Sequence, residues 1–268
     1  MPRICHPTAL FEGQTLALTA EGARHVQVLR MQPGQALTLF GDPVLGGEWT
    51  ATITDMGRSH VTVQVGAHMA VEREWPVAVH VAVSMPANDR MDWLVEKATE
   101  LGVASIQPLM SERSVLRLKD ERATKKQAHW QAVAVSACEQ CGGNRVPMVH
   151  AVQTLEAWLR APQLPQGTKL AVLSLAAGSQ SLPQVWAGWA ASWGQGPDQL
   201  PDEPDRPHMA LVLGPEGGWS PAEEQALLGA GAIPMSLGPR VLRSETAAVA
   251  SLAMLASLSS GLLPAHRL

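Results

Sequence analysis

The chain has 268 residues, of which 46% are hydrophobic, and a formal net charge of -4 at pH 7. This length suits one large or two modest domains, and the apolar content is ample for a buried core. The odd number of cysteines, 3, argues against a disulfide framework. We find no apolar leader and no apolar run long enough to span a bilayer, so we expect a cytoplasmic protein that does not enter the membrane.

The amino-terminal part, to about residue 72, has the pattern of a small β domain. We expect short strands over residues 15–19, 36–40, 48–54 and 60–65, separated by Asp, Pro and Gly residues that favour turns. One helix over residues 21–31 interrupts them and carries Arg24 and Arg30. Short strands with such turn signals are typical of a small β-barrel.

A different pattern begins near residues 72–76, and we place a domain boundary between residues 72 and 73. An apolar strand over 77–84 is of the kind that a parallel sheet buries on both faces. A helix with Met91, Leu94 and Leu101 on one face follows, then a strand over 104–110 and a long helix over 120–141. Strands that alternate with helices predict an α/β domain with a parallel sheet over residues 73–268.

Residues 148–208 are less informative. We expect a short helix over 155–159, a strand over 170–175 and a loop over 192–207 rich in Gly, Pro and Asp. The near-helical spacing of Trp158, Trp186, Trp189 and Trp193 favours core or interface packing over stacking on nucleic-acid bases.

A Cys-x-x-Cys motif ends the long helix predicted over residues 120–141. Apart from Cys138 and Cys141 the chain has one cysteine, and no His pair shows the spacing of zinc ligands. Redox motifs of this kind start a helix, where the dipole lowers the thiol pKa, whereas this one ends a helix. We therefore predict no metal site and no redox site here.

Two glycine-bearing loops near the carboxyl end each follow a short apolar strand and each precede a helix. In the first, a strand over 209–213 leads to a loop over 214–218 and to the capping box Ser220-Pro-Ala-Glu223. In the second, a strand over 233–237 leads to a loop over 238–243 and to a helix that starts at Ser244 or Glu245. Such loops can hold a nucleotide-like ligand, because glycine permits positive φ and the helix start offers N–H groups. Two ordinary βα turns would show the same glycine spacing, which matches neither a P-loop nor the dinucleotide fingerprint.

The literal text of the two loops carries a resemblance to a known family. Leu213-Gly-Pro-Glu-Gly-Gly218, followed by Leu237-Gly-Pro-Arg-Val-Leu-Arg-Ser-Glu-Thr-Ala247, resembles the paired signature of the RsmE family, the 16S ribosomal RNA uridine-N3 methyltransferases. That family belongs to the SPOUT class. The resemblance implies a SPOUT-type parallel sheet whose carboxy-terminal chain, at about residues 209–258, forms a trefoil knot that binds S-adenosylmethionine (SAM).

Two earlier segments extend this resemblance. Residues 24–34 are similar to the family's motif in its PUA-like RNA-binding domain, which implies a PUA-like β-barrel over residues 1–72. Residues 138–147 resemble the family's Glu-Gln segment. Residues 174–178, Ser-Leu-Ala-Ala-Gly, depart from the family, which has a polar segment with His or Glu there.

The chemistry of methyl transfer to uracil N3 suggests roles for the charged residues of the two loops. The N3 proton must be lost and the resulting anion stabilised. We predict that Arg243, or second Arg240, stabilises the anion or anchors phosphate, and that Glu216 shapes its loop or assists proton removal. By analogy with the family, the residues expected to hold SAM are Leu213, Gly214, Pro215, Gly217, Gly218, Leu237, Gly238, Leu242 and Thr246. The residues expected to contact RNA are Arg3, Arg24, Arg30, Arg113 and Arg145.

Basic residues outnumber acidic ones between residues 113 and 145, so a basic stripe is compatible with the negative net charge. The resemblance implies that the substrate is 16S rRNA within the 30S subunit. It also implies a homodimer, formed through the Ala- and Ser-rich helix over 245–258. Three alternatives remain: a SPOUT ribose 2′-O-methyltransferase acting on tRNA or rRNA, a non-catalytic RNA-binding factor in ribosome assembly, and a nucleotide-binding regulator.

Overall fold

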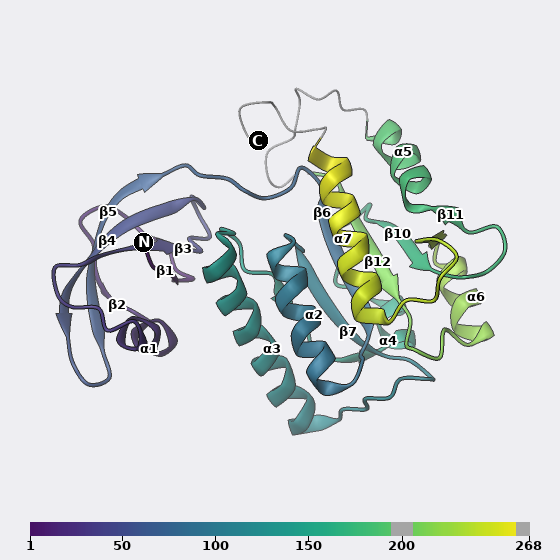
Figure 1. Ribbon diagram of the computed structural model, residues 1–268, viewed down its shortest axis with the longest axis horizontal. Coiled ribbons are helices and arrows are strands. Elements are labelled where there is room, and N and C mark those ends of the chain that lie inside the picture. The colour runs from purple at the N-terminus through teal and green to yellow at the C-terminus, as the bar shows by residue number, and fades with distance from the viewer. Residues whose placement is uncertain (194–205, 261–268) are drawn as a thin grey trace. The chain divides into compact units, whose positions relative to one another are not determined.

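The computed structural model describes residues 1–193 and 206–260 (Figure 1). Most of the loop predicted over residues 192–207, with its acidic stretch, lies outside these residues. By its internal contacts the chain divides into two units, one of residues 1–74 and 135–146 and the other of residues 75–134 and 147–268. The boundary predicted at residues 72 and 73 lies near the first division, whereas the sequence did not indicate that residues 135–146 group with the amino-terminal part.

The first unit is built on a five-stranded sheet in the order β1-β3-β4-β5-β2. Helix α1 (Ala20–Val28) begins after Thr19, whose side chain accepts a hydrogen bond from the Gly22 N–H. The predicted small domain of short strands with one helix is confirmed. Strand β1 was not predicted. The strands are β1 (Arg3–Cys5), β2 (Thr15–Ala17), β3 (Ala36–Phe40), β4 (Glu48–Met56) and β5 (Val61–Met69).

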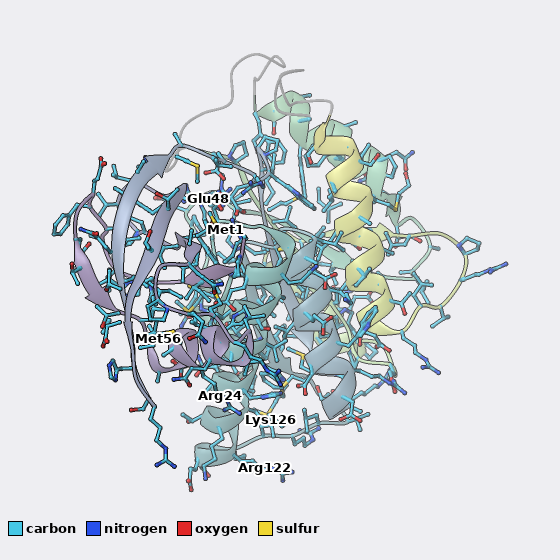
Figure 2. All side chains as sticks on the ribbon, turned by 60° about the vertical axis from the view of Figure 1, so that its left-hand side comes forward. Met1, Arg24, Glu48, Met56, Arg122 and Lys126 are labelled. Carbon is cyan, nitrogen blue, oxygen red and sulfur yellow. The ribbon has the colours of Figure 1, made fainter. Side chains whose placement is uncertain are left out.

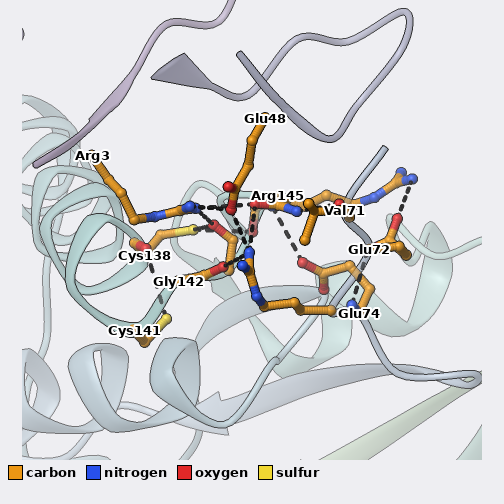
Figure 3. Close-up of polar contacts among 12 residues, drawn as sticks. Arg3, Glu48, Val71, Glu72, Glu74, Cys138, Cys141, Gly142 and Arg145 are labelled. Atoms are coloured by element: carbon orange, nitrogen blue, oxygen red, sulfur yellow. Dashed lines mark hydrogen bonds and ion pairs between the residues drawn. The ribbon is translucent and has the colours of Figure 1, made fainter. Parts of the chain in front are cut away.

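A buried carboxylate joins residues 135–146 to this sheet (Figure 3). Glu48 is 7% exposed and pairs with the guanidinium groups of Arg3 and Arg73. Burial acts to raise the pKa of Glu48, but its hydrogen bonds with Arg73 and Arg3 outweigh burial and lower that pKa. Arg3 also donates to the Gly143 carbonyl at 2.7 Å and to Asn144 Oδ1 at 3.0 Å. The end of the long helix and the residues after it are therefore tied to the β domain by charge-assisted hydrogen bonds.

The second unit is an α/β domain with a parallel sheet, as predicted, and the sheet has eight strands. The strand order is β11-β13-β10-β12-β6-β7-β8, and β9 pairs with β7. Every residue of the interior strand β6 is buried, as expected for a strand covered on both faces. The strands are β6 (Ala78–Ser84), β7 (Ser105–Met110), β8 (Met148–Val149), β9 (Gln153–Thr154), β10 (Lys169–Leu173), β11 (Gln180–Ser181), β12 (His208–Leu213) and β13 (Ile233–Ser236).

Helices α2 and α7 lie side by side against the sheet (Figure 1), and α7 also packs on strands β6 and β12. Trp158 and Leu227, from α4 and α6, pack in a separate cluster with sheet residues that include Val172. Trp158, Trp186 and Trp189 are buried, so the packing role predicted for them is confirmed. The helices are α2 (Asn88–Glu100), α3 (Asp120–Cys141), α4 (Leu155–Arg160), α5 (Leu182–Ser192), α6 (Pro221–Gly229) and α7 (Ser244–Ser260).

Within the described residues, no helix combines the length and apolar character that a membrane crossing requires.

Candidate active site

A cavity of about 450 Å³ opens where strands β10, β12 and β13 end. These strands are neighbours in the parallel sheet, so their carboxyl ends lie at one edge. Ligands of open α/β sheets bind at this edge. The wall of the cavity consists of residues from three segments, 173–176, 213–219 and 235–244, together with Glu224 and Ala247.

The first glycine loop, residues 214–218, connects β12 to the capped start of α6. Ser220 accepts a hydrogen bond from the Glu223 N–H, and Glu223 Oε2 accepts one from the Ser220 N–H at 3.0 Å. Gly218 has a φ of +69°, and a Cβ at this position would have no atom within 4 Å. Its backbone conformation therefore favours glycine, and the space beside it is open to a ligand.

Arg113 supports the first glycine loop, and Trp219 lines the cavity beside it. The Arg113 guanidinium donates to the Gly217 carbonyl at 2.8 Å and to the Trp219 carbonyl at 3.4 Å. The segment that carries Arg113 is held in turn by Ser84 and Ser114, whose buried hydroxyl groups share a hydrogen bond at 2.8 Å. The Trp219 ring lines the cavity, and its Nε1–H is buried without a hydrogen-bond partner among the described residues.

The second glycine loop, residues 237–243, runs from β13 to the start of α7. Gly238 has a φ of +117°, and its N–H donates to Ser236 Oγ at 3.1 Å. At the end of the loop the hydroxyl group of Ser244 is buried in the cavity wall, with no hydrogen-bond partner in the described part of the chain. Buried polar groups are nearly always paired, so the Ser244 hydroxyl and the Trp219 N–H mark positions where a polar ligand can bind.

The third wall segment follows β10. Ser174, Leu175 and Ala176 line the cavity, and Ser174 Oγ donates to Glu224 Oε1 at 2.5 Å. This stretch therefore contributes to the site although it departs from the family pattern. Sequence reasoning did not pair Ser174 with Glu224, because the two residues are far apart in the chain.

Arg90, in the first turn of α2, connects the first glycine loop to the start of α7 from outside the cavity. Its Nη1 forms an ion pair with Glu216 of the first loop, and its Nε lies 3.7 Å from Oε1 of Glu245 in the first turn of α7. Glu245 is 7% exposed, and its Oε2 has no hydrogen-bond partner among the described residues. Sequence reasoning did not assign Arg90 to the site.

The structure brings most of the predicted loop residues together. All of the residues predicted to hold SAM line the cavity except Thr246, which is exposed on the first turn of α7. Of the predicted catalytic residues, Glu216 and Arg240 line it as well. Arg243 is exposed, between the wall residues Leu242 and Ser244, and is not itself part of the wall.

Comparison with known proteins bears on what such a site does. A family model described as an RNA methyltransferase domain matches residues 73–256, and one described as an RNA methyltransferase PUA domain matches residues 18–66. The protein named ribosomal RNA small subunit methyltransferase E in Bacillus subtilis is 30% identical over 237 residues, which cover 88% of this chain and 87% of that protein. The chain belongs to the ribosomal RNA small subunit methyltransferase E family. The resemblance of the two loops to this family is thereby confirmed, as is the PUA-like amino-terminal domain.

Two solved structures of similar proteins extend the comparison. The methyltransferase E of Neisseria gonorrhoeae, bound to S-adenosyl methionine, is 34% identical with a TM-score of 0.80, and the match covers 96% of this chain and 98% of that one. A methyltransferase from Legionella pneumophila in complex with SAM is 35% identical with a TM-score of 0.80, and the match covers 96% and 97% of the two chains.

The five arginines predicted to contact RNA differ in their exposure and in their contacts. Arg24 and Arg30 are exposed, on and just after α1. Arg3 is held in the Glu48 network and stacks on the Phe40 ring at 4.6 Å. Arg145 is exposed but pairs with Glu72 at 3.3 Å, and Arg113 holds the first glycine loop. Arg3 and Arg113 thus have structural contacts, and contact with RNA stays a prediction for all five arginines.

Further basic side chains of the predicted stripe lie on α3. Arg122 is exposed and Lys126 half-buried, and Figure 2 shows both near one end of the helix. Lys125 forms an exposed ion pair with Glu121 at 2.6 Å. This part of the helix adds positive charge to the α/β unit.

The two cysteines of the Cys-x-x-Cys motif are thiols that form no disulfide among the described residues, Cys138 buried and Cys141 exposed. Hydrogen bonding to Cys141 and burial raise the pKa of Cys138, which keeps it protonated. Among the described residues no group of three or more His, Cys, Asp or Glu side chains is placed to hold a metal ion.

A buried histidine lies in the sheet of the α/β unit and is not part of the cavity wall. His80 of β6 is hydrogen-bonded to Ser105 Oγ at 2.7 Å through Nδ1 and to His208 at 3.0 Å through Nε2. Burial, and after it the nearby charges of His208 and Arg206, lower the pKa of His80 to about 3. The folded protein therefore keeps this imidazole neutral.

Proposed function

We propose that this chain transfers a methyl group from SAM to N3 of a uridine in the 16S rRNA of the small ribosomal subunit. The observation that carries the proposal is the cavity formed by the two glycine loops at the carboxyl edge of the parallel sheet. The wall of this cavity contains the signature residues of the family, and its volume suits a small-molecule ligand. The names of the relatives supply the substrate class, and uridine N3 comes from the resemblance to the RsmE family.

The residues of the cavity fit SAM. A volume of about 450 Å³ lies in the range of small-molecule sites. Trp219 Nε1 and Ser244 Oγ are buried polar atoms with which a ligand can form hydrogen bonds. A Cβ added at Gly218 or Gly238 would have no protein atom within 4 Å, so the space beside both glycines is open. When bound, SAM supplies the electrophilic methyl group.

The side chains at the cavity provide the remaining requirements of the reaction. The uracil ring must be held with N3 in line with the methyl group, because near-attack geometry removes much of the barrier. Loss of the N3 proton leaves negative charge on the ring. Arg240 lines the cavity and Arg243 follows it on the same loop, so a guanidinium group can stabilise that charge or hold the phosphate of the target nucleotide.

The SPOUT-type trefoil knot over about residues 209–258 is part of this proposal, and the strand order supports it. Strand β13 lies on one side of β10, whereas α7 packs on β12 and β6 on the other side. The second glycine loop must therefore carry the chain across the carboxyl ends of β10 and β12. This crossing brings residues 237–243 against the same cavity as the segments 173–176 and 213–219.

We also propose that the protein acts as a cytoplasmic homodimer on the 30S subunit. One face of α7 packs within the subunit through residues such as Leu252 and Leu255, while Ala253 and Met254 remain exposed beside it. Small residues such as Ala253 permit close approach of a second helix. Light scattering at micromolar concentration should give the mass of a dimer, and a monomer mass would refute this part of the proposal.

The experiment that tests the function uses small ribosomal subunits that lack the modification. They are incubated with the protein and SAM, and the digested rRNA is analysed by mass spectrometry for 3-methyluridine. Appearance of that nucleoside is the expected result. A 2′-O-methylated nucleoside would show that the target atom is wrong, and binding of SAM without methylation of rRNA or tRNA would favour a non-catalytic role in ribosome assembly.

A further inference from the structure

Arg90 is the residue from which we draw the further inference, because it contacts the first glycine loop and the helix that follows the second one, without lining the cavity. Its guanidinium lies between Glu216, in the cavity wall, and Glu245, at the start of α7. We propose that Arg90 is a positioning residue that holds the first glycine loop against the start of α7, and that Glu216 acts through this ion pair and not as proton acceptor. The proposal deepens the methyltransferase function above and rests on it.

The placement of Arg90 is unfavourable for its own helix. A cation in the first turn of a helix opposes the helix dipole, and residue Ala87, at the N-cap of α2, makes no side-chain capping hydrogen bond. The two carboxylates offset this cost. Glu245, by contrast, lies in the first turn of α7, where the dipole favours an anion. The position of Arg90 at the start of α2 is therefore explained by the carboxylates of Glu216 and Glu245, and not by the dipole of α2.

The contact is suited to joining two elements. Glu245 is largely buried, which fixes one end of the arrangement, whereas Glu216 and Arg90 are more exposed, with side-chain exposures of 41% and 37%. A guanidinium group presents several N–H donors in a rigid fork, so it can contact two carboxylates at once, which an ammonium group does less well. The movement of Glu216 is thereby coupled to α7, which packs along α2.

The same contact opposes a role of Glu216 as general base. Protonating the Glu216 carboxylate would weaken its ion pair with Arg90. The main chain on both sides of Glu216 lines the cavity, since Pro215 and Gly217 are also wall residues. Fixing the Glu216 side chain from outside therefore fixes the shape of the wall against which SAM binds.

The test is a double-mutant cycle with Arg90→Gln, Glu216→Gln and the double variant, read out as the Kd for SAM in the absence of RNA. We expect each single variant to bind SAM about fivefold to tenfold more weakly, and the double variant to bind no more weakly than the singles. The kcat for rRNA methylation at saturating SAM should stay within about twofold of wild type, with an unchanged pH profile. Arg90→Lys should restore part of the affinity.

Lys97→Gln is the matched control. Lys97 lies on the same helix and also contacts two carboxylates, Glu96 at 2.6 Å and Glu100 at 2.7 Å, but all three residues belong to α2. This variant should bind SAM like wild type. Thermal unfolding of each variant separates loss of the site from loss of the fold, and Arg90→Lys keeps the test open if Arg90→Gln fails to fold.

Two results would overturn the inference while leaving the methyltransferase function in place. One is wild-type affinity for SAM in both Arg90→Gln and Arg90→Lys. The other is a large loss of kcat in Glu216→Gln, with unchanged SAM affinity and an altered pH profile, which would make Glu216 the proton acceptor. Failure of the wild-type protein to bind SAM at all would instead refute the proposed function.

Discussion

Replacing Gly218 by alanine tests where the cofactor binds, and Gly231 provides the matched control. Both glycines have positive φ, +69° and +87°, and at neither would an added Cβ have an atom within 4 Å. Only Gly218 lines the cavity, whereas Gly231 lies in the turn between α6 and β13. The two substitutions therefore impose similar backbone strain but differ in whether a methyl group enters the space proposed for SAM.

The magnitudes follow from these geometries. An L-residue in the left-handed region costs about 1–2 kcal/mol, part of which the reduced entropy of the unfolded chain offsets. We expect each variant to lose about 1 kcal/mol of unfolding free energy on balance. This strain is present with and without ligand, so it cancels in the Kd. A methyl group that crowds a packed ligand costs about 1–3 kcal/mol, which is about fivefold to 150-fold in the Kd for SAM at Gly218→Ala.

Isothermal titration calorimetry with SAM, combined with chemical denaturation, measures both quantities. Gly231→Ala should bind SAM like wild type, and Gly218→Val should not bind measurably, because a β-branched side chain adds bulk and further strain. Gly218→Val with wild-type affinity would refute the position of the cofactor site. Equal loss of affinity in the two alanine variants would show that strain alone, and not the lost space, weakens binding.

Three further predictions concern charge. Arg243→Ala should lower kcat about 100-fold, and Arg240→Ala less, because a guanidinium no longer stabilises the uracil anion; wild-type kcat in both would remove these residues from the mechanism. Because the pKa of His80 is lowered from 6.5 to about 3, only the unfolded chain gains this proton as the pH falls below 6.5. Urea denaturation should therefore show a loss of about 2 kcal/mol of unfolding free energy between pH 6.5 and about 5, and His80→Gln, whose side chain cannot titrate, should lack this part of the loss. Glu48→Gln should destabilise the first unit by about 3 kcal/mol, since Arg3 would keep its charge without the buried partner; an unchanged unfolding midpoint would contradict this.

Local patterns predicted the elements that frame the site. The capping box at Ser220 and Glu223 forms as expected, because its two hydrogen bonds join residues three positions apart. The apolar run of β6 predicted a strand buried on both faces. Both signals depend on neighbours in the chain, so they can be recognised without knowing the fold.

The literal sequence of the two glycine loops also predicted most of the cavity wall, from Leu213 to Gly218 and from Leu237 to Leu242. The resemblance to the family brought the two loops together in one site, which the strand pattern alone left open as two ordinary turns. The parallel sheet explains the result, because β12 and β13 end at the same edge on either side of β10.

Other features depended on the tertiary structure. The contact of Arg90 with Glu216 and Glu245, the hydrogen bond from Ser174 to Glu224 and the ion pairs of Glu48 each join residues that are distant in the chain. Their side chains meet only after the strands have paired and the helices have packed, and no periodicity records such a meeting. The sequence by itself thus determined the family, the ligand loops and the secondary-structure elements that frame them, while tertiary packing decided which charged side chains hold those loops in place.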